Sequence, residues 1–299
     1  MVDALIGGLS ARAARLLRLV HDAPGLTRAE AARLLGVGSG AVSELTETLR
    51  RASLLSERPA PATGRGRPTR QLVAHPGGPL VLAAAPWRAP EGENRGEPFR
   101  WRVHAVELGG RPVAGSFAAD LSDAVDKLVT RLGSRIRAAA AAGGTEVTAD
   151  FPITGGEAAF AAVAEARRGA ARGATLHLHV DRRSGASLTA RGRPLAGDPG
   201  HLPFGDPAVR CFCGSGGCWI SGATPLFGRG IAGLVNGFGV EVVTVAGIDV
   251  SALTIHYRAG LTSARRTDPP PLLPAALGDD GPLLGASETA WSALLARRP

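Results

Sequence analysis

The chain has little of three things that would each place it in a recognisable class. It holds only three cysteines in 299 residues, an odd number that cannot form a complete set of disulfides. No run of about 18 uncharged apolar residues occurs, which excludes a membrane-spanning helix of ordinary length. Residues 1–4 lack the basic opening of a signal peptide. We therefore expect a reduced, cytoplasmic protein without a membrane partner.

Lysine is also nearly absent. Lys127 is the only one, so the formal net charge of +8 comes from arginine. Abundant arginine and alanine partly reflect codon usage, so a basic isoelectric point alone does not indicate nucleic-acid binding. The distribution is more informative, because residues 1–75 hold 11 arginines against 6 acidic residues, which is +5 of the +8. This asymmetry favours a nucleic-acid surface in the N-terminal quarter.

The three cysteines lie together in a glycine-rich segment, residues 211–218, and His201 lies ten residues before the first. This spacing suits a tight turn on which the sulfurs of Cys211, Cys213 and Cys218 converge. Three thiolates and one imidazole form a closed tetrahedral shell for zinc, with Zn–S bonds of about 2.3 Å and no open position for water. The pattern predicts a structural zinc site. The alternative is a glycine-rich loop with buried thiols and no metal.

Residues 10–53 have the periodicity of three short helices. Ser10 is placed to cap the first, Thr27 and Glu30 form a capping box at the second, and Ser39 is placed to cap the third. The positions expected to be buried in the first and third helices are Ala13, Leu16, Leu17, Val20, Val42, Leu45 and Leu49. Two short helices joined by the turn at residues 36–38 predict a helix-turn-helix.

The third helix is the candidate reader of the major groove, because small residues at its start allow a close approach to base edges. Residues 52–55 and 71–74 are strand-like. The glycine–arginine–proline segment between them, residues 63–70, is typical of a wing that reaches phosphates or a narrow minor groove. The candidate DNA-contacting residues are Thr27, Ser39, Gly40, Ser43, Thr46, Arg50, Arg65, Arg67 and Arg70.

Each half of this N-terminal region also has a simpler interpretation. Three helices can serve only packing or dimerisation, and an arginine run can be a solvated loop. Helices, cap, turn and basic hairpin occurring together in winged-helix order favour DNA binding over either alternative.

The remainder of the chain mixes strands and helices, which predicts α/β layers. Helices are expected at residues 120–141, 158–172, 226–237 and 285–296. Strands are expected at residues 80–84, 101–108, 175–180 and 240–245, with a polar linker at residues 90–98.

The segment from Gly197 to Cys218 resembles the signature of the ROK family of repressors and sugar kinases, G-E-x-G-H followed by C-x-C-G-x-x-G-C. His201 and the three cysteines match it, and Asp198 replaces the glutamate. The wing resembles that of ROK repressors, a domain which the sugar kinases lack, and residues 274–286 are similar to the usual ROK end. The resemblance implies an actin-like, sugar-kinase-like α/β fold with a zinc knuckle, behind an N-terminal winged helix-turn-helix.

Two phosphate-binding segments of the family's kinases have no counterpart here. The kinases open the fold with D-x-G-G-T, whereas residues 82–86 read LAAAP. Their second loop, G-T-G-x-G-x-G, corresponds to DRRSGAS at residues 181–187, where side chains replace bare amides. The catalytic aspartate of N-D-x-x-x-A aligns only weakly, with Gly156 and Glu157. Phosphoryl transfer needs several phosphate contacts at once, so we expect no enzyme activity and no catalytic residues.

The resemblance also implies an effector site. In family members the glutamate and histidine of G-E-x-G-H bind sugar hydroxyls, and a glutamate after the last cysteine contributes. Asp198 and His201 are the corresponding effector-binding candidates, and Glu157, which aligns weakly with the catalytic aspartate, is a third. Ile220 replaces the later glutamate. The alternative is that Asp198 only turns the loop and His201 serves only the metal.

Together these features predict a transcriptional repressor that binds a double-stranded DNA operator as a homodimer or dimer of dimers and responds to a sugar-like effector. Residues 1–75 would form the winged domain, and residues 76–299 a degenerate ROK domain with its knuckle at 201–218. The rivals are a sugar kinase with a fused N-terminal domain, and a regulator that has lost sensing and keeps the body for dimerisation.

Overall fold

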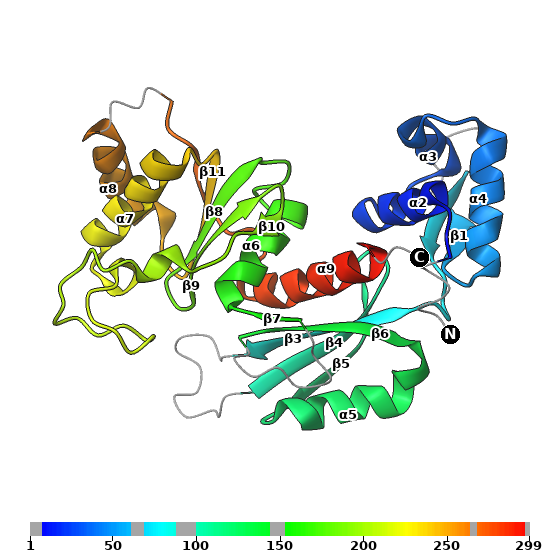
Figure 1. The fold of residues 1–299 in the computed structure, drawn as a ribbon, viewed down its shortest axis with the longest axis horizontal. Coiled ribbons are helices and arrows are strands. Elements are labelled where there is room, and N and C mark those ends of the chain that lie inside the picture. The colour runs from blue at the N-terminus through cyan, green and yellow to red at the C-terminus, as the bar shows by residue number, and fades with distance from the viewer. Residues whose placement is uncertain (1–7, 61–68, 88–99, 144–152, 264–267, 297–299) are drawn as a thin grey trace. The chain divides into compact units, whose positions relative to one another are not determined.

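The computed structural model describes residues 8–60, 69–87, 100–143, 153–263 and 268–296 (Figure 1). The chain divides into two compact units. One comprises Met1–Ala141, Val147–Ile153 and Ser287–Pro299, and the other comprises Ala142–Glu146 and Thr154–Ala286. The domain boundary expected at residue 75 lies inside the first unit and stays a prediction. No helix in the described part of the chain is both long and apolar enough to cross a membrane.

The described part of the first unit begins with an N-terminal module of helices followed by an antiparallel strand pair. Its elements are α2 (Ala11–Asp22), α3 (Arg28–Leu35), α4 (Ser39–Arg51), β1 (Leu55–Pro59) and β2 (Arg70–Ala74). The Ser10 side chain accepts from the Ala13 amide, and Thr27 with Glu30 forms the expected capping box. Gly36 then ends α3 with φ 68°, a left-handed conformation that glycine adopts easily.

Helix α4 differs from the prediction at its start and along its buried face. Gly38 is the N-cap, and Ser39 is the first helical residue. The buried residues are Val42, Thr46 and Leu49, whereas Leu45 is only half-buried. Positions 42, 46 and 49 are spaced four and three apart, so they share one helix face, and Thr46 is carried into the interior with it.

The first unit continues with a five-stranded sheet in the order β5-β4-β3-β6-β7, of which only the last residue of β6 and the last two of β7 fall in the second unit. Strand β3 pairs antiparallel with β4 and parallel with β6. Helix α5 packs its apolar face against β4 and β5 through Ala124, Val125 and Leu128. The elements are β3 (Leu80–Trp87), β4 (Arg100–Glu107), β5 (Pro112–Ala118), α5 (Leu121–Leu132), β6 (Ile136–Ala142) and β7 (Ile153–Gly155).

The prediction of one helix over residues 120–141 is wrong in its second half. Helix α5 ends at Leu132, a short 3-10 turn covers Gly133–Arg135, and β6 follows. The alanines of β6 have high helix propensity, but the last four residues of the strand are buried. Because β6 pairs with β3 inside the sheet, burial in this context outweighs intrinsic propensity.

The second unit contains a five-stranded sheet in the order β10-β9-β8-β11-β12, in which β8, β11 and β12 are parallel. The expected helices and strands of this region are confirmed to within a few residues, while α8, β9, β10 and β12 were not predicted. Its elements are α6 (Glu157–Arg168), β8 (Leu176–Asp181), β9 (Gly185–Ala190), β10 (Arg193–Pro194), α7 (Thr224–Phe238), β11 (Val242–Ala246), α8 (Val250–Ser263) and β12 (Leu272–Pro274). Helix α9 (Gly281–Ala296) begins in this unit, and its residues from Ser287 onward belong to the first unit.

Alternation along β8 separates an apolar face from a polar one. Leu178 and Val180 join the apolar core formed with α7 and α8. His177, His179 and Asp181 therefore lie on the opposite face. The side chains of both histidines are almost completely buried there.

Candidate metal centre and nucleic-acid interface

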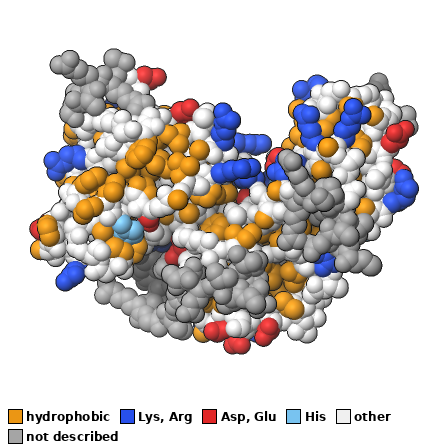
Figure 2. All heavy atoms as spheres, in the orientation of Figure 1, with side chains coloured by type: hydrophobic (Ala, Val, Ile, Leu, Met, Phe, Trp, Pro, Cys, Tyr) orange, Lys and Arg blue, Asp and Glu red, His pale blue; other side chains and the backbone are white. Residues whose placement is uncertain are grey.

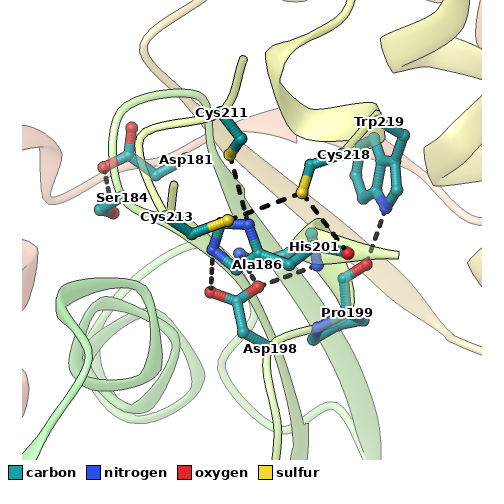
Figure 3. A network of polar contacts seen from close by, with 11 residues as sticks. Asp181, Ser184, Ala186, Asp198, Pro199, His201, Cys211, Cys213, Cys218 and Trp219 are labelled. Atoms are coloured by element: carbon teal, nitrogen blue, oxygen red, sulfur yellow. Dashed lines mark hydrogen bonds and ion pairs between the residues drawn. The ribbon is translucent and has the colours of Figure 1, made fainter. Parts of the chain in front are cut away.

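The four predicted metal ligands come together in the second unit (Figure 3). One donor atom from each of His201, Cys211, Cys213 and Cys218 lies within 4.8 Å of the other three. Cys211 Sγ is 3.4 Å from His201 Nδ1, and Cys213 Sγ is 3.7 Å from Cys218 Sγ. A tetrahedral zinc shell with bonds of about 2.0–2.3 Å has edges of roughly 3.4–3.8 Å, so these residues fit the ion.

Turns of the chain position the ligands. His201 ends a 3-10 turn, Pro199–His201, whose first residue accepts a 2.7 Å hydrogen bond from the indole of Trp219, a buried side chain. The cysteine loop closes on itself, because the Cys211 amide donates to Ser215 O and the Gly214 amide donates to Cys211 O. Gly214 has φ 89°, which a residue with a side chain rarely adopts.

The environments of the thiols differ. Burial raises the pKa of the Cys218 thiol to about 12, and hydrogen bonds with the neighbouring thiols add to the effect. Cys213 is exposed, and its pKa is lowered, first by a hydrogen bond with the Ser215 backbone. A bound divalent cation would favour the deprotonated form of all the thiols, since thiolates rather than thiols are zinc ligands.

Asp198 lies beside the cluster and contacts His201. Its Oδ1 accepts from the amides of Ala186 and Gly200, both at 2.8 Å, and its Oδ2 is 3.4 Å from His201 Nε2. A Cβ on Gly185 would lie 2.1 Å from Asp198 Oδ2, so only glycine fits there. A carboxylate on the second ring nitrogen is the arrangement that orients metal-binding histidines.

The third effector candidate, Glu157, is the first residue of α6, and its charge acts on Arg183. Arg183 itself pairs with Asp279 and with Asp181, 3.7 Å away. Asp181 also accepts from the Ser184 hydroxyl at 2.8 Å. The segment aligned with a kinase phosphate loop is thus engaged in its own side-chain contacts.

The N-terminal module presents part of the predicted DNA-contacting set. Ser39 and Gly40 are exposed at the start of α4, and Ser43 is half-buried with its hydroxyl donating to Ser39 O at 3.0 Å. As a DNA-contacting candidate Thr46 was expected on the exposed side of the third helix, but it is 1% exposed, so this expectation is wrong. Arg50 is exposed but donates two hydrogen bonds to Glu47, at 2.8 and 2.9 Å.

The remaining DNA-contact candidates lie at the second helix and the hairpin. The Thr27 hydroxyl is used in the capping box, where it accepts from the Glu30 amide and donates to the Glu30 carboxylate. Arg70 is exposed on β2 and pairs in register with Pro59. Arg65 and Arg67 lie outside the described residues.

One buried polar network in the second unit was missed by the sequence analysis. The Thr244 hydroxyl bridges His177 Nε2 at 2.7 Å and His179 Nδ1 at 2.9 Å, and Thr189 contacts His177 Nδ1 at 3.2 Å. Burial lowers the pKa of His177 to about 3, with a further contribution from His179. The alternation L-H-L-H-V at residues 176–180 could have placed both rings on one face of a strand.

Searches of protein-family models and of curated proteins found no match to the chain. Among solved structures, a ROK family transcriptional regulator described as a homologue of the E. coli MLC protein is 16% identical, with 95% of this chain and 96% of that chain covered and a TM-score of 0.62. A ROK hexokinase from Thermus thermophilus is 22% identical, with 72% and 99% covered and a TM-score of 0.55.

A ROK glucokinase from Streptomyces griseus, solved with glucose and AMPPNP, is 16% identical, with 71% of this chain and 99% of that chain covered and a TM-score of 0.54. These identities are low, so the likeness concerns the fold. The chain has the α/β, actin-like fold of ROK proteins, which confirms this part of the fold implied by the sequence resemblance. The winged helix-turn-helix and the zinc knuckle stay predictions. Regulators and kinases share this fold, so the activity must be argued from the sites.

Proposed function

We propose that the protein is a DNA-binding transcriptional repressor, in which the N-terminal module acts as a winged helix-turn-helix on an operator. The carrying observation is the order α2-α3-α4-β1-β2, with exposed Ser39 and Gly40 opening the third helix. No atom comes within 4 Å of a Cβ built on Gly40, so the start of α4 is unobstructed. Unobstructed small residues at the start of this helix suit insertion into a major groove.

The coverage of the solved structures supports the same proposal. The regulator aligns with 95% of this chain. The hexokinase aligns over 99% of its own length but covers only 72% of this chain. The unmatched share is about a quarter of the chain, the size of residues 1–75. A module that accompanies a regulator but not a kinase is expected to carry the regulator's DNA-binding activity.

The contacts of residues 181–184 argue against the rival proposal of a sugar kinase. Backbone amides that approach phosphate must be free of side chains. Here the Arg183 amide donates to Asp181 Oδ1 at 2.9 Å, and Arg182 donates to Gly222 O at 3.0 Å. Two arginines and a carboxylate thus take the place of a glycine loop, so we expect no phosphorylation of glucose or N-acetylated hexoses.

The second unit would be stabilised by zinc and would bind a small polyhydroxyl effector. Asp198 and His201 keep 34% and 24% of their side chains exposed, which leaves them accessible to a ligand. Asp198→Asn keeps the side-chain shape and removes the charge, so it should weaken the effect of a sugar on DNA binding. A response indifferent to this change would leave the unit as a dimerisation platform.

A homodimer, or a dimer of such dimers, completes the proposal. Two copies related by a two-fold axis would place two α4 helices about one helical turn apart on a near-palindromic operator. An effector would act by favouring a form of the dimer in which this spacing is lost.

The test begins with selection of genomic fragments by the purified protein, followed by footprinting of the selected site. Ser43→Ala is then compared with Thr48→Ala, because both hydroxyls donate to the carbonyl four residues earlier in α4. We expect Ser43→Ala to change the preferred base at one position by about 1–3 kcal/mol, and Thr48→Ala to leave the preference unchanged. Failure to select any site would exclude the proposed function.

A further inference from the structure

A group of arginines at one end of the sheet in the second unit is used by neither the metal centre nor the N-terminal module. Residues 166–194 hold seven arginines and one acidic residue, a local charge of +6. Arg182 and Arg183 follow the last residue of β8, and the other five lie toward its beginning. The basic cluster is defined as Arg167, Arg168, Arg172, Arg191 and Arg193.

Two segments converge to form the basic cluster. Helix α6 ends at Arg168, and the β9–β10 hairpin turns at Arg191. The Arg191 amide donates to Thr175 O at 2.7 Å, which fixes the hairpin beside the start of β8. A Cβ on Gly192 would lie 3.6 Å from Arg167 Cγ, so the hairpin tip packs against the end of α6. Figure 2 shows basic side chains gathered where Figure 1 places α6 and β10.

Three of the five arginines of the basic cluster have no acidic partner among the described residues. Arg172, Arg191 and Arg193 are exposed, and the interactions of the described residues give none of these three a carboxylate partner. Glu241 lies at the edge, where its carboxylate accepts from the Thr175 amide at 2.8 Å. Crowding of like charges raises the local potential, which favours binding of a polyanion.

The residue at the tip of the β9–β10 hairpin, Arg191, has a backbone conformation that is unfavourable for a residue with a side chain. Arg191 has φ 50°, and Ser53 is the only other non-glycine residue with positive φ in the described chain. Hairpin turns with two successive residues at positive φ favour Asn-Gly, yet this one is Arg-Gly. A residue held in a disfavoured conformation suggests a function for its side chain.

We propose that the basic cluster binds the phosphate backbone of duplex DNA and is a second DNA-contacting surface in addition to the N-terminal module. Guanidinium groups match phosphate oxygens bidentately, and exposed arginines on adjacent segments suit a repeating backbone. DNA is the polyanion that complements this charge in a protein whose N-terminal quarter is already basic. The inference rests on the proposed function.

The test measures binding of the full-length protein to a 40-base-pair operator duplex and to a random duplex of the same length over a salt series. The variant is Arg191→Asn with Arg193→Gln, which removes two charges and places a favoured residue in the turn. We expect roughly tenfold weaker binding to both duplexes and a salt slope reduced by about two, with a melting temperature no lower than that of the wild type.

The matched control is Arg131→Gln with Arg229→Gln, two exposed arginines on α5 and α7, for which we expect unchanged binding. Unchanged binding of the cluster variant, or an equal loss in the control, would overturn the inference. If the cluster variant binds DNA like the wild type but no longer binds vesicles that contain phosphatidylserine, the cluster would be assigned to a membrane surface instead. If the wild type binds neither duplex, the proposed function itself fails.

Discussion

At the scale of single residues, Cys213 offers a test of whether a bound metal stabilises the cysteine loop. Cys213 is exposed, so its thiol contributes little by burial, and its importance depends on coordination. We predict that Cys213→Ser loses stoichiometric zinc and lowers the melting temperature, because zinc binding to a preformed site adds to the free energy of folding. Elemental analysis and thermal melting of protein prepared without added metal test this.

A chelator provides the control for the cysteine variant. With zinc removed, wild type and Cys213→Ser should melt within a degree or two of each other, since the exposed side chain then has no ligand role. A difference that persists in chelator, or a wild type that contains no zinc, would support the metal-free loop instead.

Thr46 is the residue at which sequence and structure disagree most clearly. Its hydroxyl oxygen is buried and has no hydrogen-bond partner in the described chain. An unsatisfied buried polar group costs about 1–3 kcal/mol, so we predict that Thr46→Val, which has nearly the same shape, raises the free energy of unfolding by about 1 kcal/mol. Urea unfolding measures the gain, and operator preference should not change. A changed preference would show that position 46 reaches a base.

At the scale of elements, the polar face of β8 makes stability depend on pH. His177 has a pKa of about 3 in the folded protein because it is buried, against about 6.5 in the unfolded chain. The unfolded state therefore binds a proton that the folded state does not, and stability falls as the pH drops from 6.5 toward 3. We predict that the wild type loses about 2 kcal/mol more between pH 7 and 5 than His177→Gln.

Urea unfolding at several pH values measures this difference, and His256→Gln, which changes a half-buried histidine on α8, is the comparison. The His256 variant should follow the wild-type profile. If the free energy of unfolding depends on pH in the same way for the wild type and for His177→Gln, then His177 takes up its proton without unfolding.

The elements also show what the sequence can predict. Helices with a side-chain cap were located well because this signal is local, as α2 with its apolar stripe and α3 with its capping box illustrate. The alanine run of β6 was predicted as helix, since nothing local reveals that β3 lies beside it. The four residues that could hold a metal were predicted to come together because their spacing in the sequence is short. The basic cluster was missed because it needs α6 and the β9–β10 hairpin to meet.

At the scale of the whole molecule, the fold alone does not fix the activity. The same architecture occurs in a regulator and in kinases that cover less of this chain. The features of this chain that bear on its activity are local: the N-terminal module and the contacts of Arg182 and Arg183. The function therefore has to be tested at these features separately.

The N-terminal module is joined to the end of the chain inside the first unit. His21, the penultimate residue of α2, is 1% exposed, and its Nε2 lies 3.1 Å from Glu288 Oε2 on α9. The Gly109 amide, in the turn between β4 and β5, donates to His21 Nδ1 at 3.1 Å. The ring also lies 5.6 Å from Trp291. One imidazole thus links three segments that are far apart in the sequence.

We predict that His21→Ala lowers the free energy of unfolding by about 3 kcal/mol, because it removes one partner of a buried pair and leaves a cavity beside Trp291. His75→Ala is the control: His75 is half-buried, its Nδ1 accepts only a local hydrogen bond from the Gly77 amide, and its loss should cost well under 1 kcal/mol. Urea unfolding followed by tryptophan fluorescence measures both. Equal free energies of unfolding for His21→Ala and His75→Ala would show that the contact between α2 and α9 does not stabilise the fold. If His21→Ala lowers the free energy of operator binding by more than it lowers the free energy of unfolding, the contact between α2 and α9 also orients the N-terminal module for DNA.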